Sequence, residues 1–588
     1  MNDFSQEIKP SLSMNTIGAY IVLIGWAIIF TFLSIYVINA YLPVYDMEFH
    51  LARMVGLAQS ISNGDILPNL NHLFSYGTGY ASSMFYGNWQ FYPAAMVYIF
   101  TKDAIGAYTF FAFCMNSFAI LSTFHFTRKL TQSKLNSFLV AMIVPCFYPA
   151  FGFGMTMVIG FVPMLFYAIY KVLYLEEYNP ILLGVTIALL IQTHLLSTIV
   201  LAISSMFFVA CNAKKINLHV LLSFGKSILI GLALSAGFLF QYVEQVLSQK
   251  FYFSWVTRNF PVDNKLMFDM SHNFHSGFTS LTNLYDVALK IAIFYFIINF
   301  FQLKPISKSL VGVIVLTYIS MTGILPWHTT LKYTFLGNLQ YTERLSYFLP
   351  VLIMMIFAIE CNRRFLQGAV GAVFLVYLIS FVLPYSVTHQ KMSQKLMNQH
   401  NKLMLKAYED AKNVFINPIG DEYYTLDVDN MAIRQDNFAE FSELENVKVS
   451  NIQYGYNFLQ FDVEVQNQGV ATSLVVPKVG YSGYKVSYSN GGKGSQAAQK
   501  KVLRTEEEVV KMKKLKMPVE TEKVLHNGRI YLTIQESGTV TISHHKTILQ
   551  YLGFLLEAFF WLFLVLYCYT GDLILPADIR EKCGFLIE

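Results

Sequence analysis

Four ionisable residues stand where the first long apolar run of the chain ends. The segment YLPVYDMEFHLAR follows the apolar residues 16–41 and contains Asp46, Glu48, His50 and Arg53. A carboxylate can accept a proton, a histidine can orient or exchange one, and an arginine can bind a phosphate. At a membrane surface, these residue types would suit acid–base chemistry on an anionic substrate.

A helical wheel separates these four residues. An α-helix advances about 100° per residue, which puts Asp46, His50 and Arg53 on one face at i, i+4 and i+7. Glu48 falls on a different side, so Asp46 and Glu48 are not predicted to form a paired-carboxylate site. One interpretation is a surface helix whose polar face only meets water. The other is a catalytic face in which Asp46 is the base.

The composition makes lipid the main solvent of this chain. Of its 588 residues, 54% are hydrophobic and 13% are charged, whereas soluble domains carry about 25% charged residues. A membrane-crossing helix needs roughly 20 apolar residues, and about twelve segments approach that length. They are 16–41, 105–127, 136–151, 155–174, 180–193, 195–212, 218–241, 286–302, 309–325, 345–361, 367–384 and 548–570. We therefore expect a polytopic α-helical membrane protein.

Lysine and arginine predict the orientation of the spans, because cytoplasmic loops carry an excess of them. With the N-terminus inside, every inner loop is basic, as at 128–129, 214–215 and 363–364, whereas the outer turn at His194 is not. This pattern requires the run 89–100 to be an outer half-helix, since it covers only about 18 Å. We expect both termini to be cytoplasmic.

The polar segments divide the chain into a bundle and an outer insert. Apolar and polar residues alternate in NFLQFDVEVQN and in NGRIYLTIQESGTVTISHH, which is typical of strands. An extracytoplasmic domain with a β-sandwich is therefore expected near the C-terminus. The expected parts are a transmembrane bundle at 1–384 with outer loops 42–104, 242–285 and 326–344, an outer α+β domain at 385–546, and a final span with a cytoplasmic tail at 547–588.

Several short motifs resemble those of bacterial GT-C-fold membrane glycosyltransferases. The pattern DxxxHxxR at Asp46 is followed by GYASSMFYGNWQFYP and then by the outer half-helix. The segment LPWHTTLKYTFLGNLQYTERLSYFLP is similar to a tryptophan loop followed by an LQFPxR motif, although Tyr-Thr-Glu stands here where Phe-Pro-Trp is frequent. The nearest resemblance is to YfhO-like proteins and to the membrane family labelled "6-pyruvoyl-tetrahydropterin synthase related".

The resemblance implies an inverting glycosyltransferase of the bacterial plasma membrane. The donor would be a polyprenyl-phosphate-linked sugar, and the acceptor a cell-envelope glycan or a teichoic-acid-type polymer at the outer face. A phosphate leaving group needs no general acid, so one base and bound cations suffice. Asp46 is the expected base and Arg344 the expected phosphate ligand. The candidate substrate-binding residues are His50, Arg53, Tyr86, Tyr92, His194, Arg258, Trp327, Gln340 and Arg344.

Other interpretations stay open at this point. Arg344 can reach lipid headgroups, His194 can be a packed core histidine, and Trp327 can be an interface anchor. The protein could instead be a transporter or flippase of lipid-linked precursors, or a non-catalytic scaffold that binds envelope polymer. No cluster has metal-ligand spacing, so no cofactor is predicted, and divalent-metal dependence stays open. Nothing in the pattern indicates nucleic acid as a partner.

Overall fold

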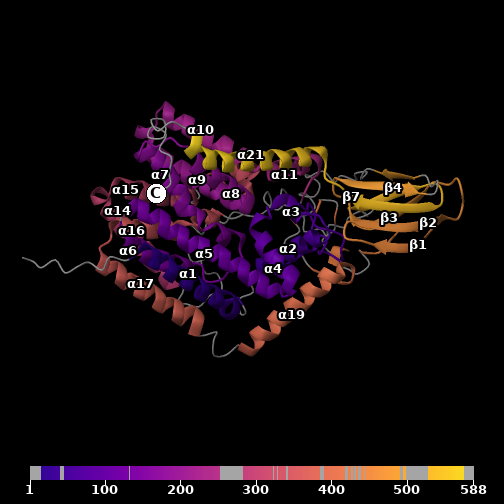
Figure 1. Ribbon diagram of the computed structural model, residues 1–588, viewed down its shortest axis with the longest axis horizontal. Coiled ribbons are helices and arrows are strands. Elements are labelled where there is room, and N and C mark those ends of the chain that lie inside the picture. The colour runs from indigo at the N-terminus through magenta and orange to yellow at the C-terminus, as the bar shows by residue number, and fades with distance from the viewer. Residues whose placement is uncertain are drawn as a thin grey trace, which may run out of the picture.

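A computed structural model of the chain shows a helical body with a small sheet domain at one end (Figure 1). The residues that the structure describes are 15–39, 45–131, 133–251, 283–321, 324–327, 329–339, 342–383, 390–416, 422–425, 428, 432–434, 439–442, 444–489, 494–497 and 528–574.

Within the described residues, four helices are long and apolar enough to cross a membrane. They are α1 with its continuation η1 (Thr16–Phe32 and Leu33–Ile38), α5 (Ala104–Thr131), α17 with η11 (Arg363–Tyr377 and Leu378–Val382) and α21 (Ile548–Ile574). A fifth span would be α10 (Leu218–Ala233) and α11 (Ala236–Ser248) taken together, which are bent by 75°. The chain is thus mostly helical with membrane-length helices, and the remaining spans of the predicted twelve stay a prediction.

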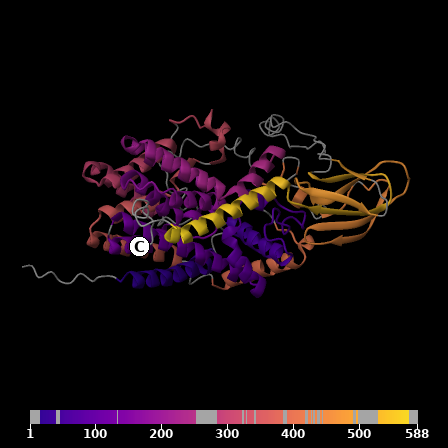
Figure 2. The ribbon, with the colours of Figure 1, turned by 45° about the horizontal axis from the view of Figure 1, so that its top comes forward.

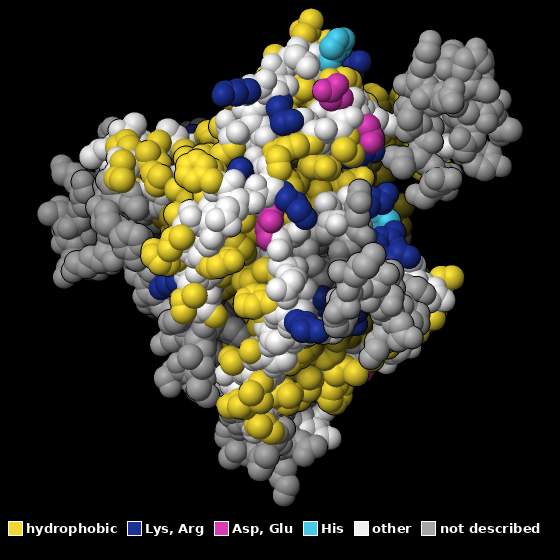
Figure 3. Space-filling model, turned by 90° about the vertical axis from the view of Figure 1, so that its left-hand side faces the viewer, with side chains coloured by type: hydrophobic (Ala, Val, Ile, Leu, Met, Phe, Trp, Pro, Cys, Tyr) yellow, Lys and Arg dark blue, Asp and Glu magenta, His cyan; other side chains and the backbone are white. Residues whose placement is uncertain are grey.

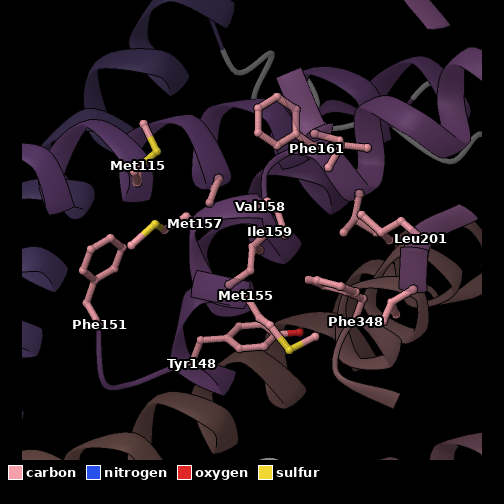
Figure 4. Packing of buried hydrophobic residues seen from close by; sticks show 14 of the residues in the cluster. Met115, Tyr148, Phe151, Met155, Met157, Val158, Ile159, Phe161, Leu201 and Phe348 are labelled. Carbon is pink, nitrogen blue, oxygen red and sulfur yellow. The ribbon is translucent and has the colours of Figure 1, made fainter. Parts of the chain in front are cut away.

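The other helices of the body are shorter, because turns interrupt the apolar runs. They are α6 (Lys134–Ile143), η3 (Val144–Phe147), η4 (Gly154–Val158), α7 (Phe161–Tyr174), α8 (Ile181–Thr193), α9 (Leu195–Cys211), η5 (Ala213–Lys215), α14 (Asn283–Ile298), η7 (Phe300–Gln302), α15 (Pro305–Met321), η8 (Leu331–Tyr333), η9 (Phe335–Leu339), η10 (Thr342–Ser346) and α16 (Leu349–Glu360). Figure 4 shows how side chains of η4, among them Met155 and Val158, fill the space near Phe161, Leu201 and Phe348.

The segment after the first span folds as expected into short helices. They are α2 (Tyr45–Ser62), α3 (Ser82–Phe85), η2 (Trp89–Phe91) and α4 (Tyr92–Thr101). Pro93 lies in the first turn of α4, where its missing N–H costs nothing. The helix α19 (Gln390–Glu409) packs against α2 and α5. These contacts place α2 between α5 of the helical body and the segment that leads to the sheet domain.

The sheet domain is a sandwich of two antiparallel sheets. Its strands are β1 (Val447–Tyr454), β2 (Phe458–Val465), β3 (Thr472–Val479), β4 (Tyr484–Ser489), β5 (Gly494–Ala497), β6 (Arg529–Ile534) and β7 (Gly538–His544), preceded by η12 (Ala411–Asn413) and η13 (Ala432–Arg434). One sheet has the order β1-β2-β7-β4 and the other β3-β6-β5. Alternate side chains of both sheets, such as Phe461 and Leu532, share one buried core. The sandwich is as the alternation predicts.

Helix α21 connects the sheet domain to the helical body and runs beside α11 (Figures 1 and 2). Its carboxylate Glu557 meets the bend between α10 and α11. One oxygen of Glu557 accepts the backbone N–H of Gly237 at 2.8 Å, and the other accepts Nε2 of Gln192 at 2.9 Å. Gln192 and the indole of Trp561 both donate to the carbonyl of Leu234, at 2.7 and 3.0 Å. The backbone groups that the bend exposes are thus satisfied by side chains.

Replacing Glu557 with alanine should therefore destabilise the helical body. The N–H of Gly237 and the amide of Gln192 would each lose an acceptor inside an apolar bundle, at a cost of about 1–3 kcal/mol. The measurement is the thermal unfolding midpoint of the full chain in detergent. Glu557→Gln, which keeps an acceptor oxygen, is the matched control. Its unfolding midpoint should lie between those of the wild type and of Glu557→Ala. A midpoint for Glu557→Ala equal to that of the wild type would contradict the capping role.

Candidate functional site

Arg53 is a buried cation whose described contacts include no carboxylate. Its side chain is 2% exposed, and its NH2 group donates to the carbonyl of Gly87 at 2.9 Å and to Oδ1 of Asn88 at 3.3 Å. The guanidinium lies 4.6 Å from the ring centre of Tyr86 and 4.9 Å from that of Phe91. Aromatic faces and neutral acceptors thus stabilise the charge. Burial lowers the pKa of Arg53 to about 10, which leaves it charged at neutral pH.

His50 lies one turn before Arg53 and is also 2% exposed. Its Nδ1 accepts a hydrogen bond from NH1 of Arg53 at 3.1 Å. Burial first, and then the charges of Arg53 and His194, hold the pKa of His50 well below its usual value. His50 is therefore a neutral imidazole at physiological pH. The polar face of α2 is consequently packed inside the protein and does not simply meet water.

His194 joins this group from the turn between α8 and α9. Its Nδ1 accepts the backbone N–H of Ser197 at 3.2 Å and lies 2.7 Å from the hydroxyl of Ser197, which caps the start of α9. Its ring lies 5.6 Å from the ring of Tyr86. Burial, followed by the charges of Arg344 and Arg53, lowers the pKa of His194 to about 3. This histidine is thus both a helix cap and a neutral neighbour of the two arginines.

Asp46 and Arg344 are less completely buried than His50, Arg53 and His194. Asp46 lies in the first turn of α2, where a carboxylate also faces the positive end of the helix. Burial raises the pKa of Asp46 to about 6, and the opposing charge of Arg344, in η10, keeps it from rising further. A carboxyl group that titrates near neutral pH is suited to accept a proton. Together these two residues offer a base and a cation at the accessible edge of the cluster.

Tyr86 connects the members of the cluster, and the polar insert at 385–546 supplies a residue that the sequence did not reveal. The rings of Tyr86 and Tyr423 meet edge to face, with their centres 5.6 Å apart. Tyr423 belongs to the insert, and no motif around it pointed to the site. A sequence pattern could not have found it, because its contact partners are far away along the chain.

Two further predicted site residues, Tyr92 and Trp327, have other described contacts. The hydroxyl of Tyr92 donates to the carbonyl of Ile66, and the charges that act on it are those of Asp65 and Glu557. Trp327 is buried, and its indole N–H donates to the carbonyl of Ser320 at 2.7 Å. Its described contact therefore stabilises the turn after α15. Gln340 and Arg258 lie outside the described residues.

Two further searches of the described chain concern other kinds of site. No three His, Cys, Asp or Glu side chains among the described residues gather as a possible metal-ligand set. A surface depression on α19 is lined by exposed polar side chains, namely Gln394, Lys395, Asn398, Gln399 and Lys402. None of the titratable residues of the cluster around Asp46 lines it.

Comparison with known proteins adds no family to this description: no protein-family model matches the chain, and no curated protein matches it.

The geometry of Arg53 predicts a strict requirement for its guanidinium. Arg53→Lys keeps the charge but cannot reach both Gly87 and Asn88 with a planar fork, so it should destabilise the protein by roughly 2 kcal/mol or more. The measurement is thermal unfolding of the full chain in detergent. Lys402→Ala, at an exposed position of α19, is the control and should change the midpoint little. An unchanged midpoint for Arg53→Lys would show that the fork is not required.

Proposed function

We propose that this protein is an inverting glycosyltransferase that moves a sugar from a polyprenyl-phosphate donor to a cell-envelope glycan or teichoic-acid-type polymer. The reaction would take place at the outer face of a bacterial plasma membrane. The single observation that carries the proposal is the pairing of a largely buried carboxyl group of raised pKa, Asp46, with the cation Arg344, whose charge acts on it. A base and a phosphate ligand at one accessible edge are what such a reaction requires.

The proposed step uses Asp46 as the general base. The hydroxyl oxygen of the acceptor attacks the anomeric carbon of the sugar while the bond from that carbon to the phosphate oxygen breaks. Asp46 takes the proton of the hydroxyl group, and polyprenyl phosphate leaves as an anion. Arg344 binds the phosphate and stabilises the charge that grows on it. Because attack and departure occur on opposite faces of the carbon, the anomeric configuration inverts.

The buried residues of the cluster would hold Asp46 and Arg344 in position. His50 and His194 are buried and neutral, so they do not compete with Arg344 for the phosphate. Arg53 is enclosed by Gly87, Asn88 and aromatic rings. Its charge extends the positive potential beneath the site, which favours an anionic substrate.

The distribution of basic residues supports the proposed orientation. The predicted inner loops meet at one end of the helical body: Lys304 donates from Nζ to the carbonyl of Ile359 at 2.8 Å, and Asn136 donates to the carbonyl of Cys361 at 3.1 Å. Figure 3, which views the end away from the sheets, shows more Lys and Arg than Asp and Glu. A basic end favours the cytoplasm, with both chain termini there. His194 and Arg344 lie at the opposite ends of α9 and α16, which would be the outer side.

The sequence motifs supply the substrate class. The DxxxHxxR pattern and the segment that ends in Arg344 resemble those of YfhO-like GT-C enzymes. Six side chains lie close enough together that the charges of some shift the pKa values of others. They are Asp46, His50, Arg53, Tyr86, His194 and Arg344. That grouping is what a shared site built from these motifs requires.

A transporter or flippase of lipid-linked precursors is the second candidate, and the bend between α10 and α11 favours it. Interrupted membrane helices bind substrates in many transporters, and Glu557 lies at this interruption. Both carboxylate oxygens of Glu557 already accept hydrogen bonds, from Gly237 and Gln192. The bend is therefore occupied by the protein's own groups, and this ranks transport second.

Replacing Asp46 with asparagine should strongly reduce the rate of sugar transfer. Without a base, the transfer rate in membranes should fall by about 100-fold or more, the usual contribution of a positioned general base. The measurement is transfer of labelled sugar from undecaprenyl-phosphate donors to envelope polymer. Glu48→Gln is the matched control, because Glu48 lies on another face of the same helix, and its rate should stay near that of the wild type.

Three results would count against this assignment. Full transfer by a folded Asp46→Asn protein would exclude Asp46 as the base. Absence of transfer by the wild type from any sugar donor, with donor movement across the membrane intact, would favour transport. Absence of both activities, with retained binding of envelope polymer, would favour a scaffold.

The pH dependence of transfer follows from the raised pKa of Asp46. The base must be ionised, so the rate should fall as the pH decreases through about 6, with about one-tenth of the plateau rate at pH 5. The effect of this group on stability has the opposite sign. Because its pKa is raised in the folded state, its contribution is present below the ordinary value of 3.8 and is lost as the pH rises through about 6. Asp46→Asn should therefore be at least as stable as the wild type at pH 7.5, which separates loss of catalysis from unfolding.

A further inference from the structure

Helix α4 carries large apolar side chains on its surface. Tyr92, Met96 and Phe100 follow one another at i, i+4 and i+8, so their side chains form one stripe along the helix. Met96 is 42% exposed and Phe100 is 79% exposed, whereas Ala95 and Tyr98 are buried, and the helix packs on α2 and α5. The stripe therefore faces away from the helical body, although its residues are apolar.

Two more exposed apolar residues lie at the start of this stripe. Ile66 is 62% exposed and Leu67 is 38% exposed, and both belong to the loop that follows α2. The hydroxyl of Tyr92 donates to the carbonyl of Ile66, which brings this loop to the first turn of α4. We call Ile66, Leu67, Met96 and Phe100 together the apolar patch. Continuous exposed apolar surfaces mark contacts with membranes, partners or ligands.

One end of the apolar patch lies where a membrane-length helix begins. Helix α4 ends at Thr101 and α5 begins at Ala104, so Phe100 precedes a candidate span by only a few residues. The two residues between the helices, Lys102 and Asp103, are charged, and charged side chains are costly inside the hydrocarbon. This end of α4 must therefore lie near the level of the lipid headgroups.

The other end of the apolar patch lies at the start of α21, the last candidate span. Asp65 forms an ion pair with Lys546 at 2.9 Å, and the side chain of Asn69 donates to Oε1 of Gln550, in the first turn of α21. The two loop residues of the patch lie between these bonded positions. Since α4 is only about 15 Å long, the patch connects the beginnings of two membrane-length helices on the side of the sheet domain.

We propose that Ile66, Leu67, Met96 and Phe100 insert into the membrane leaflet nearest the sheet domain, where lipid acyl chains cover the apolar patch. Helix α4 is then an interfacial helix, whose apolar face lies about 5–10 Å into the boundary between headgroups and acyl chains. Because α2 packs on α4 (Figure 1), this insertion sets the depth of α2, and with it that of Asp46, relative to the membrane. The insertion is independent of the reaction that the protein catalyses.

The test places the photo-cross-linking amino acid p-benzoylphenylalanine at single exposed positions of the full chain, reconstituted in phosphatidylcholine vesicles. Three phenylalanines form a matched set. Phe100 belongs to the patch, Phe563 is 57% exposed on α21 and serves as the lipid-facing reference, and Phe458 is 41% exposed on β2 and serves as the reference in the sheet domain. After illumination, mass spectrometry measures the fraction of each variant that carries a covalently bound lipid.

Position 100 should give lipid adducts at a level comparable with position 563, and position 458 should give few. The same replacement at Ile66 should also give lipid adducts, because the loop and α4 form one surface. A yield at position 66 or 100 no higher than that at position 458 would overturn the proposal. Cross-linking of position 100 to a second copy of the chain in place of lipid would also overturn it, since protein would then cover the patch.

Discussion

The buried guanidinium of Arg53 imposes the strongest constraint on this part of the molecule. A charge removed from water without an ionic partner is expensive unless fixed dipoles replace the solvent. Here they are the carbonyl of Gly87, the amide of Asn88 and the faces of Tyr86 and Phe91. All of these belong to one stretch of chain, so that stretch must follow α2 closely.

The position of residues 86–91 beside α2 also brings this loop into contact with the helical body. Gly87 packs so closely on the carbonyl of Gln192 that no side chain has room at position 87. The indole of Trp89 donates to Thr193 at 3.1 Å, at the end of α8. The next residue is His194, which thereby comes to lie beside Tyr86. The cluster is thus assembled by backbone packing, and the neutral histidines follow from their burial near two arginines. Asp46 is left with a raised pKa at the edge.

The sequence predicted which residues of α2 share a face, whereas the site assignment and the count of twelve spans stay predictions. The helical wheel placed His50 and Arg53 on one face, because spacing alone decides which residues of a helix neighbour one another. It could not say that this face is buried, since burial depends on the loop at 86–91. Strand alternation predicted β2, β6 and β7, but it missed β1, where a bulge with Asn451 at a φ of 49° breaks the period. The apolar run 218–241 was predicted as one span, and in the structure it is bent by 75° near Ser235, where Glu557, Gln192 and Trp561 from distant parts of the chain bond the freed backbone groups.

The sheet domain is attached to the site by buried polar contacts, and this limits how it can move. Lys478 on β3 is buried, which lowers its pKa to about 8, and its Nζ donates to the carbonyl of Gly77 at 2.6 Å. Asp65, just after α2, forms an ion pair with Lys546 at 2.9 Å. Undocking would have to return these groups to water and also expose the apolar surface around Tyr481 and Phe251. Because these contacts are made to the segment that directly follows α2, the sheet domain is expected to stay fixed against the loops at 65–80.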